Sequence, residues 1–180
     1  NERAECYRGR CLAYGEGITF LPVVEVVTQA AGLDEDDTVE GAREKIAALL
    51  APEDDPLVAR RVSQAIGIGG SDVASPEETF WAIRTFFEGL ARHRPTILLF
   101  DDLQWGEPTF LELIEHVAEW SDDVPLMLLC LARLDFLEGH RAWGGGKPNA
   151  TSLLLEPLRQ EDGDTLLRNL LGNAELAPRD

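Results

Sequence analysis

Short continuous apolar runs mark the predicted strands of this chain. Runs at 96–100 and 125–132 are bounded by charged residues or proline, and their length is typical of strands buried in a parallel sheet. A weaker alternation of polar and apolar residues at 5–11 predicts another short strand, which leads into the glycine-containing turn 14–17. A last short strand is predicted at 152–155.

Other segments repeat their apolar residues every three or four positions, which predicts amphipathic helices. The predicted helices are 22–31, 39–49, 57–66, 76–90, 108–117 and 166–171, the last ending at Gly172. Ser75 is expected to cap the helix that Pro76 begins, with Glu78 bonding back to the cap. Asp37 is expected to cap the helix at 39–49, with Glu40 completing a capping box.

The order of these elements predicts the fold class. A strand, a helix and a strand at 96–132 form a βαβ unit, so we expect an α/β protein with a parallel sheet and helices on both faces. The 180 residues, 44% of them apolar, suit a single domain, 1–180. Its parts are a strand with a glycine-rich turn (5–17), a helical insert (22–94), a central core (95–134) and a C-terminal strand and helix (152–172).

The charge of the chain narrows the classes of function. A formal net charge of -17 argues against direct nucleic-acid binding, because such binders place Lys and Arg against phosphates. No run approaches the roughly 18 to 20 apolar residues of a membrane helix, so no membrane contact is expected. Three cysteines are an odd number in a chain too large to need disulfides, which favours a cytoplasmic location.

Two adjacent acids are the strongest candidates for chemistry. Asp101 and Asp102 follow the apolar run at 96–100, and the carboxyl ends of parallel strands are where open α/β sheets bind ligands. In phosphoryl-transfer ATPases this is the Walker B arrangement, in which the first acid holds Mg²⁺ and a neighbouring acid positions the attacking water. Adjacent strand residues face opposite ways, so both acids serve one site only if the chain bends there. The spacing alone equally fits a strand that ends in acids because loops are polar.

Arg133 follows the run at 125–132 and is expected beside these acids, where a cation can sense a terminal phosphate. From its position alone, Arg133 is better interpreted as an arginine that pairs with a surface acid. A phosphate-binding loop requires glycines followed by Gly, Lys and Ser or Thr, and no such run is present. Two partial matches, 144–147 and 67–71, are interpreted as loops because Pro148 replaces the hydroxyl residue in the first and the second has no lysine.

Several runs together carry a specific resemblance that covers nearly the whole chain. They are RGRC and YGEGITF within 8–20, SPEETFW at 75–81, DDLQWGEP at 101–108, LCLAR at 129–133, and WGGGK with NAT within 143–151. In these runs the chain resembles the AAA-like (STAND) signal-transduction ATPase domains that accompany bacterial adenylate or guanylate cyclases and large LuxR-type transcriptional regulators. Gln104 stands where relatives often have histidine, and Leu134 where they often have proline.

The resemblance implies an ATP-driven switch domain in a multidomain signalling or transcription regulator. Carried over by position, Asp101 binds Mg²⁺, Asp102 is the catalytic acid, and Arg133 is the sensor. ATP and Mg²⁺ are the implied ligands of the intact protein. Its implied partners are attached output domains, either a cyclase or a DNA-binding domain, and further copies of itself.

The resemblance also implies a three-layer sheet of the P-loop NTPase (ASCE/AAA-like) type that lacks its phosphate-loop strand. In the family that strand lies upstream of residue 5, and it pairs between the Arg133 strand and the strand expected at 152–155. We therefore expect a gap in the sheet or an exposed edge, which invites pairing with another chain or direct closing of the sheet, and weak or no binding of ATP by these 180 residues alone. The alternative is a non-catalytic protein-interaction module on a degenerate ATPase scaffold.

Overall fold

The computed structural model describes residues 3–13, 19–51, 54–69 and 74–171. The turn predicted at 14–17, part of the loop at 67–71, and Gly172 lie outside these ranges. The chain forms two compact units, Asn1–Ala150 and Thr151–Asp180, each of which is described by itself.

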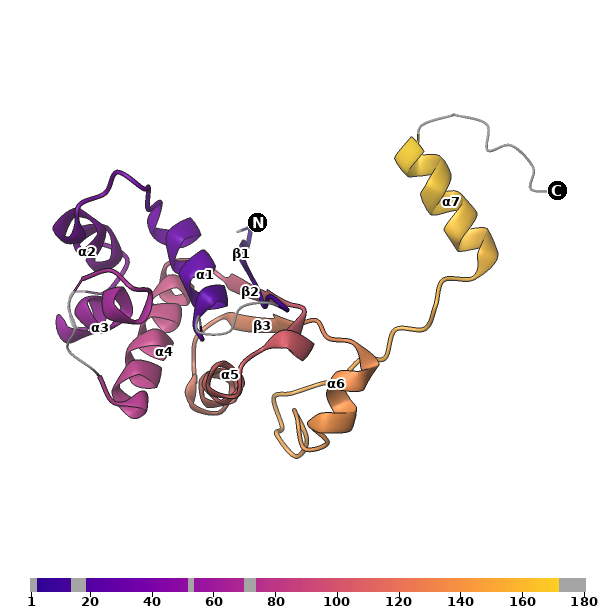
Figure 1. Ribbon diagram of the computed structural model, residues 1–180. Helices are drawn as coiled ribbons and strands as arrows, with labels where there is room; N and C mark the ends of the chain where they lie inside the picture. Colours follow the sequence, from indigo (N-terminus) through magenta and orange to yellow (C-terminus); the bar gives the residue numbers. More distant parts are fainter. Residues whose placement is uncertain (1–2, 14–18, 52–53, 70–73, 172–180) are drawn as a thin grey trace. The chain divides into compact units, whose positions relative to one another are not determined.

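The first unit is built on a three-stranded parallel sheet (Figure 1). Its strands are β1 (Glu5–Arg10), β2 (Thr96–Asp101) and β3 (Leu126–Cys130), and they lie in the order β1-β2-β3. Glu5 pairs with Thr96 and Thr96 with Leu126, so the three strands begin level with one another. The predicted α/β class and the parallel pairing of the three strands are confirmed.

The five helices predicted in the first unit lie close to their predicted segments, whereas two short helices at 103–105 and 134–139 were not predicted. The first unit contains α1 (Leu21–Ala31), α2 (Val39–Ala47), α3 (Leu57–Ala65), α4 (Pro76–His93), the short 3₁₀ helix η1 (Leu103–Trp105), α5 (Pro108–Trp120) and α6 (Leu134–Gly139). The predicted cap of α4 is confirmed, since the Ser75 side chain accepts a hydrogen bond from the backbone N–H of Glu78 at 3.2 Å. The predicted cap of α2 is wrong: Thr38 caps the helix, and Asp37 instead pairs with Lys45 at 2.7 Å.

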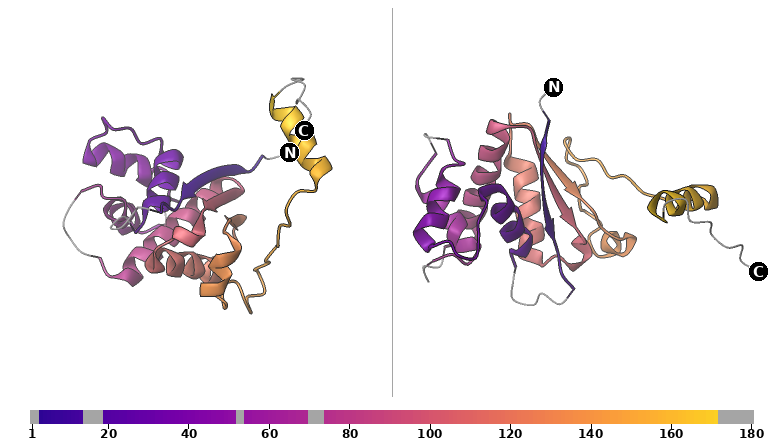
Figure 2. Two further views of the ribbon diagram at one scale, coloured as in Figure 1. Left: turned by 45° about the vertical axis from the view of Figure 1, so that its right-hand side comes forward. Right: turned by 90° about the horizontal axis from the view of Figure 1, so that it is seen from above.

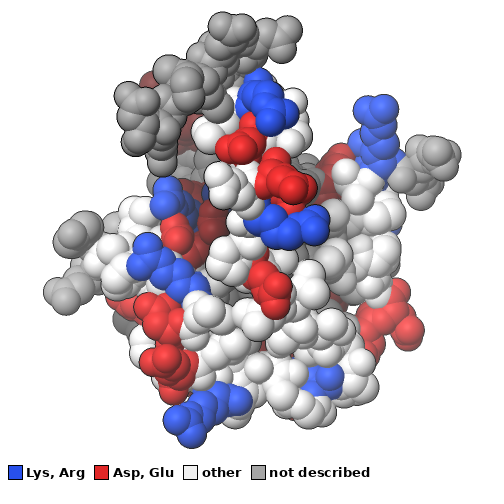
Figure 3. Space-filling model, turned by 90° about the vertical axis from the view of Figure 1, so that its right-hand side faces the viewer, with Lys and Arg blue, Asp and Glu red and all other residues white. Residues whose placement is uncertain are grey.

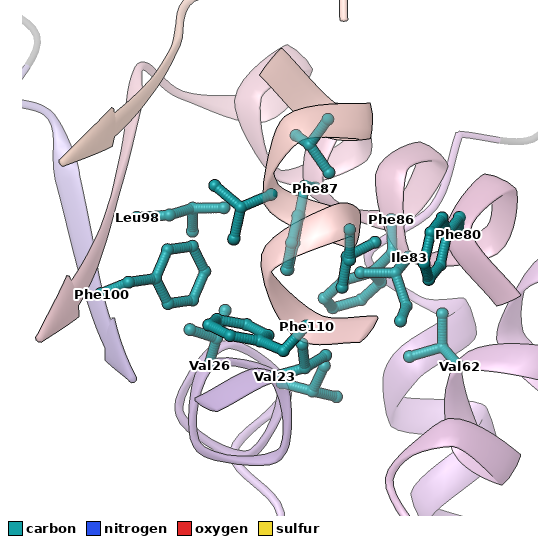
Figure 4. Close-up of a cluster of buried hydrophobic side chains, with 14 of the residues drawn as sticks. Val23, Val26, Val62, Phe80, Ile83, Phe86, Phe87, Leu98, Phe100 and Phe110 are labelled. Atoms are coloured by element: carbon teal, nitrogen blue, oxygen red, sulfur yellow. The ribbon is translucent and has the colours of Figure 1, made fainter. Parts of the chain in front are cut away.

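Helices α1, α4 and α5 lie on one face of the sheet, α2 and α3 pack against α1 and α4, and α6 lies beside η1 (Figure 2). Thr96, Leu98 and Phe100 alternate along β2 and are buried on that face. Figure 4 shows Leu98 and Phe100 pointing from β2 into a cluster of apolar side chains from the helices. The cluster includes Val23, Val26, Val62, Phe80, Ile83, Phe86, Phe87 and Phe110. The ring of Phe100 meets that of Phe110 edge to face at 5.3 Å, which ties β2 to α5.

No helix of the first unit covers the opposite face of the sheet in the described residues, so the expectation of helices on both faces is not met within this unit. Cys6 is exposed on β1, and Met127 and Leu129 on β3 are 53% and 36% exposed. Ile97 and Leu99 on β2 lie between them and are half-buried. We call Cys6, Ile97, Leu99, Met127 and Leu129 the open face. Their apolar character explains why the sequence pattern predicted a sheet covered on both sides.

The two edges of the sheet differ. Along β1, the side chain of Gln29 on α1 accepts from the Arg8 N–H at 3.0 Å and donates to the Arg8 carbonyl at 2.6 Å. Glu25 accepts from the Arg10 N–H at 2.6 Å. These side chains block the β1 edge against a further strand. No strand pairs with the outer edge of β3 within the described residues, which agrees with the expected exposed edge.

The described residues of the second unit, 151–171, form an irregular segment and one helix. Residues 152–155 form no strand, contrary to the prediction, and Leu153, Leu154 and Leu155 are 81%, 65% and 75% exposed. An apolar run forms a strand only when its backbone N–H and C=O groups can hydrogen-bond to a neighbouring strand. The described residues of this unit contain no such strand. Helix α7 (Gln160–Leu171) contains the predicted final helix, 166–171, and begins six residues earlier. Among the described helices, none has the length and apolar character needed to span a bilayer.

Gly9 makes the close approach of β1 to α1 possible. A β-carbon at this position would lie 2.3 Å from the carbonyl oxygen of Pro22. We expect Gly9→Ala to lower the free energy of unfolding by about 1–3 kcal/mol, because backbone must move to make room. Gly139→Ala is the matched control, since nothing lies within 4 Å of its added carbon. Equal stability of both variants in urea unfolding would contradict this packing.

The three cysteines differ in exposure, so their reactivity with a thiol reagent tests which face of the sheet is open to solvent. Burial raises the pKa of the Cys11 and Cys130 thiols to about 12, whereas Cys6 is exposed on the open face. Because the thiolate is the reactive form, iodoacetamide at pH 8 should modify Cys6 rapidly and the other two only after unfolding. Peptide mass spectrometry measures this order. Protection of Cys6 in the native protein would mean that the open face is covered in solution.

Candidate functional site

A bend in the chain brings the two predicted acids together at the carboxyl end of β2. Asp101 is the last residue of the strand, and Asp102 has φ 59° and ψ 40°, a left-handed conformation that aspartate tolerates better than most residues. The Asp102 N–H donates to the Asp101 carboxylate at 2.9 Å. The next residue, Leu103, is buried, and its N–H donates to the Leu131 carbonyl at 3.0 Å. The bend that a shared site requires is therefore present and is held by β3.

Each carboxylate is paired with an arginine of the neighbouring strand. Arg8 pairs with Asp101, and Arg10 donates from Nε and Nη2 to Oδ2 of Asp102, both at 2.7 Å. Arg10 lies directly opposite Asp101 in the parallel register, so β1 presents both arginines on the side of the acids. Sequence reasoning missed both arginines. Their spacing of two residues on a predicted strand, which places them on one face, was the available signal.

Gln104 connects the acids to Arg133. Its amide nitrogen donates to Oδ1 of Asp102 at 2.9 Å, and its amide oxygen accepts from the backbone N–H of Arg133 at 3.2 Å. Arg133 stands just before α6, and its charge also helps to lower the pKa of Asp102. The structure therefore brings Asp101, Asp102 and Arg133 to the same edge of the sheet, as predicted. The functional roles given to them remain predictions.

The carboxylate of Asp102 is held in its ionised form. The hydrogen bond from Arg10 lowers its pKa most, and the hydrogen bond from Gln104 lowers it further. A lowered pKa in the folded state stabilises the fold above the ordinary aspartate pKa near 3.9, and this contribution disappears as the pH falls through the folded value. Asp102 is thus ionised at neutral pH, and the guanidinium group of Arg10 balances its charge.

A hollow of about 310 Å³ opens beside Asp102. It is lined by Arg10, Cys11, Leu12, Ala13, Asp102 and Trp105. Trp105 is 47% exposed, so an aromatic surface, a guanidinium group and a carboxylate all border the hollow. Such a combination suits a ligand with a flat apolar part and charged groups.

The two glycine-rich segments do not form a phosphate cradle in the described residues. Lys147 pairs with Glu119 at 3.4 Å, and the side chain of Asn149 donates to the Ala118 carbonyl at 2.7 Å. These contacts hold the loop at 144–147 against the end of α5. In the other segment, Gly67 and Gly69 have positive φ, and the residues from 70 to 73 lie outside the described ranges.

The described residues contain no cluster of three or more potential metal ligands among the His, Cys, Asp and Glu side chains. A cation at Asp101 and Asp102 therefore has to take further ligands from water or from its own partner molecule. On the face drawn in Figure 3, basic and acidic side chains are interspersed and form no continuous basic patch.

Comparison of the chain with protein-family models, curated proteins and solved structures found no match.

The pairing with Arg10 makes a prediction about Asp102. Arg10→Gln removes the largest cause of the lowered pKa, so the pKa of Asp102 should rise toward the ordinary aspartate value. Carbon-detected NMR titration of the side-chain carboxyl measures it. Arg94→Gln is the control, since Arg94 pairs with Glu5 at the other end of β1. An unchanged titration of Asp102 in Arg10→Gln would mean that the pair does not form in solution.

Proposed function

We propose that this chain is the nucleotide-dependent (ATP) switch domain of a multidomain bacterial signal-transduction or transcription regulator. One observation carries the proposal: two carboxylates meet at the carboxyl end of the middle strand of a parallel sheet, with Arg133 beside them. Open α/β sheets bind ligands at this edge, and phosphoryl-transfer sites need a metal-binding acid there. The resemblance in sequence supplies ATP as the ligand.

The residues present fit a magnesium ion. Mg²⁺ prefers oxygen ligands and usually takes one or two carboxylates, with water and phosphate oxygens completing its coordination. The side chains of Asp101 and Asp102 are 23% and 27% exposed, so a hydrated ion from solution can reach them. Asp101 would hold the ion, which neutralises charge on the phosphates, and Asp102 would orient and deprotonate the attacking water.

Arg133 suits the role of a sensor for the terminal phosphate. Its backbone is held by Gln104, which also bonds Asp102, so a shift of the carboxylate is transmitted to the start of α6. A guanidinium group recognises phosphate oxygens through paired hydrogen bonds. Nucleotide state would in this way reach α6 and, through it, self-association and the attached cyclase or DNA-binding output domain.

The open edge of β3 supports a larger sheet of the P-loop NTPase type. Side chains of α1 block the edge at β1, whereas β3 has no pairing strand in the described residues. A phosphate-loop strand can therefore be added only beside β3, next to Arg133, where its loop would face the two acids. The proposed full-length protein is a cytoplasmic Mg-dependent ATPase, and these 180 residues alone are proposed to be inactive.

Asp102→Asn in the full-length protein tests the proposal. The substitution should leave ATP binding nearly unchanged and reduce hydrolysis by about 100-fold or more, because it removes the acid that activates water. Asp122→Asn is the matched control, since Asp122 is an exposed acid in the loop before β3, at the opposite end of the strands. Normal turnover in Asp102→Asn would remove Asp102 from its proposed role.

The second candidate is a non-catalytic protein-interaction module. The exposed apolar side chains of Met127 and Leu129 favour it, because contiguous exposed apolar residues on a sheet often mark contacts with other proteins. The same experiment separates the two. If the full-length wild-type protein binds ATP and hydrolyses it, the switch is supported, and if it does neither, the module is.

A further inference from the structure

All four carboxylate oxygens of Asp101 and Asp102 are engaged by other groups of the chain. In Asp101, Oδ1 accepts from the Asp102 N–H and Oδ2 pairs with Arg8. In Asp102, Oδ1 accepts from Gln104 and Oδ2 from Arg10. Each oxygen keeps a second lone pair, so a metal ion that binds these acids has to share them with these groups or replace one of the two arginines.

The two arginines are held in place by the strand that carries them. The backbone N–H groups of Arg8 and Arg10 donate to Gln29 and Glu25 on α1, so the strand is anchored on its outer side. Arg8 and Arg10 are two residues apart and thus share a face of the sheet. The backbone positions of Arg8 and Arg10 are therefore fixed by the register of β1 against β2, and this register places both guanidinium groups within reach of the acids.

The exposure of the arginines makes the pairs replaceable. Their side chains are 60% and 56% exposed, and ion pairs in such settings contribute little to stability. A guanidinium group and a divalent cation nevertheless compete for the same carboxylate oxygens, and each repels the other. Removing the arginine charge therefore costs the fold little and changes the affinity of the acids for a cation substantially.

We propose that Arg8 and Arg10 are positioning residues that occupy the two carboxylates in the metal-free state and keep their affinity for a divalent cation low. This inference rests on the proposed magnesium site and describes its regulation. When a cation takes the acids, the released guanidinium groups lie side by side and need an anionic partner. The cation is then bound well only together with a polyphosphate ligand, whose oxygens the arginines can pair with.

Titration of the full 180-residue chain with Mn²⁺ alone tests the proposal. Trp105 borders the hollow beside Asp102, so Mn²⁺ at the acids should broaden its indole N–H resonance. Trp105→Phe assigns the resonance, and the exposed Trp120 serves as an internal reference. In Arg8→Gln/Arg10→Gln the concentration of Mn²⁺ that half-broadens the Trp105 signal should fall by about tenfold, the order expected when positive charges a few ångströms from a dication are removed.

Two further variants separate charge from structure. Arg8→Lys/Arg10→Lys keeps the charges and should return the midpoint close to the wild-type value, whereas a purely structural role would not be rescued by lysine. Arg94→Gln removes one positive charge from the far end of β1 and should leave the midpoint unchanged. Thermal unfolding of each variant verifies that it folds.

The possible failures are distinguishable. If Asp101→Asn/Asp102→Asn abolishes the broadening but the glutamine variant binds Mn²⁺ no more tightly than the wild type, the inference is wrong and the metal site stands. If Mn²⁺ broadens the Trp105 signal selectively in neither the wild type nor the glutamine variant, the metal site itself is wrong and the inference falls with it.

Discussion

The left-handed backbone conformation of Asp102 is the constraint on which the candidate site depends. Along a regular strand, the side chains of Asp101 and Asp102 would point to opposite faces of the sheet. With φ at 59°, the chain turns immediately after β2, and both carboxylates come within reach of arginines on β1. The turn is stable because the Leu103 side chain is buried and its backbone N–H donates a hydrogen bond to the Leu131 carbonyl. The position of the two carboxylates therefore depends on the burial of the apolar residue that follows them.

The sheet gives this edge its rigidity and its asymmetry. Phe100, one residue before the acids, packs against Phe110 of α5, so the end of β2 is fixed by the same core that holds the helices. On one side, Gln29 and Glu25 block the edge of β1; on the other, β3 ends near Arg133, and no strand pairs with its outer edge among the residues that the structure describes. The acids thus lie between the blocked edge at β1 and the edge at β3, where a further strand can pair.

Local sequence patterns predicted the strands of the sheet and most of the helices. The features that they did not predict depend on contacts between segments that are distant in the sequence. Continuous apolar runs were sufficient for β2 and β3, and a serine before a proline for the start of α4. At α2, Asp37 and Thr38 are both good caps, and only the contact of Asp37 with Lys45 decides between them. The arginines were missed because their partners lie about ninety residues away, at positions set by strand register. An apolar run at 152–155 was taken for a strand although pairing depends on a neighbour that sequence pattern does not reveal.

The central claim is that the bend at Asp102 assembles one cation site from two adjacent acids. Crystals of the full-length protein grown with Mn²⁺ and ATP, measured at a wavelength where manganese scatters anomalously, test it most directly. We expect an anomalous peak within coordination distance of the Asp101 carboxylate, with Asp102 facing the same ion or its water. A peak elsewhere, with Asp101 and Asp102 still bound to Arg8 and Arg10, would contradict it.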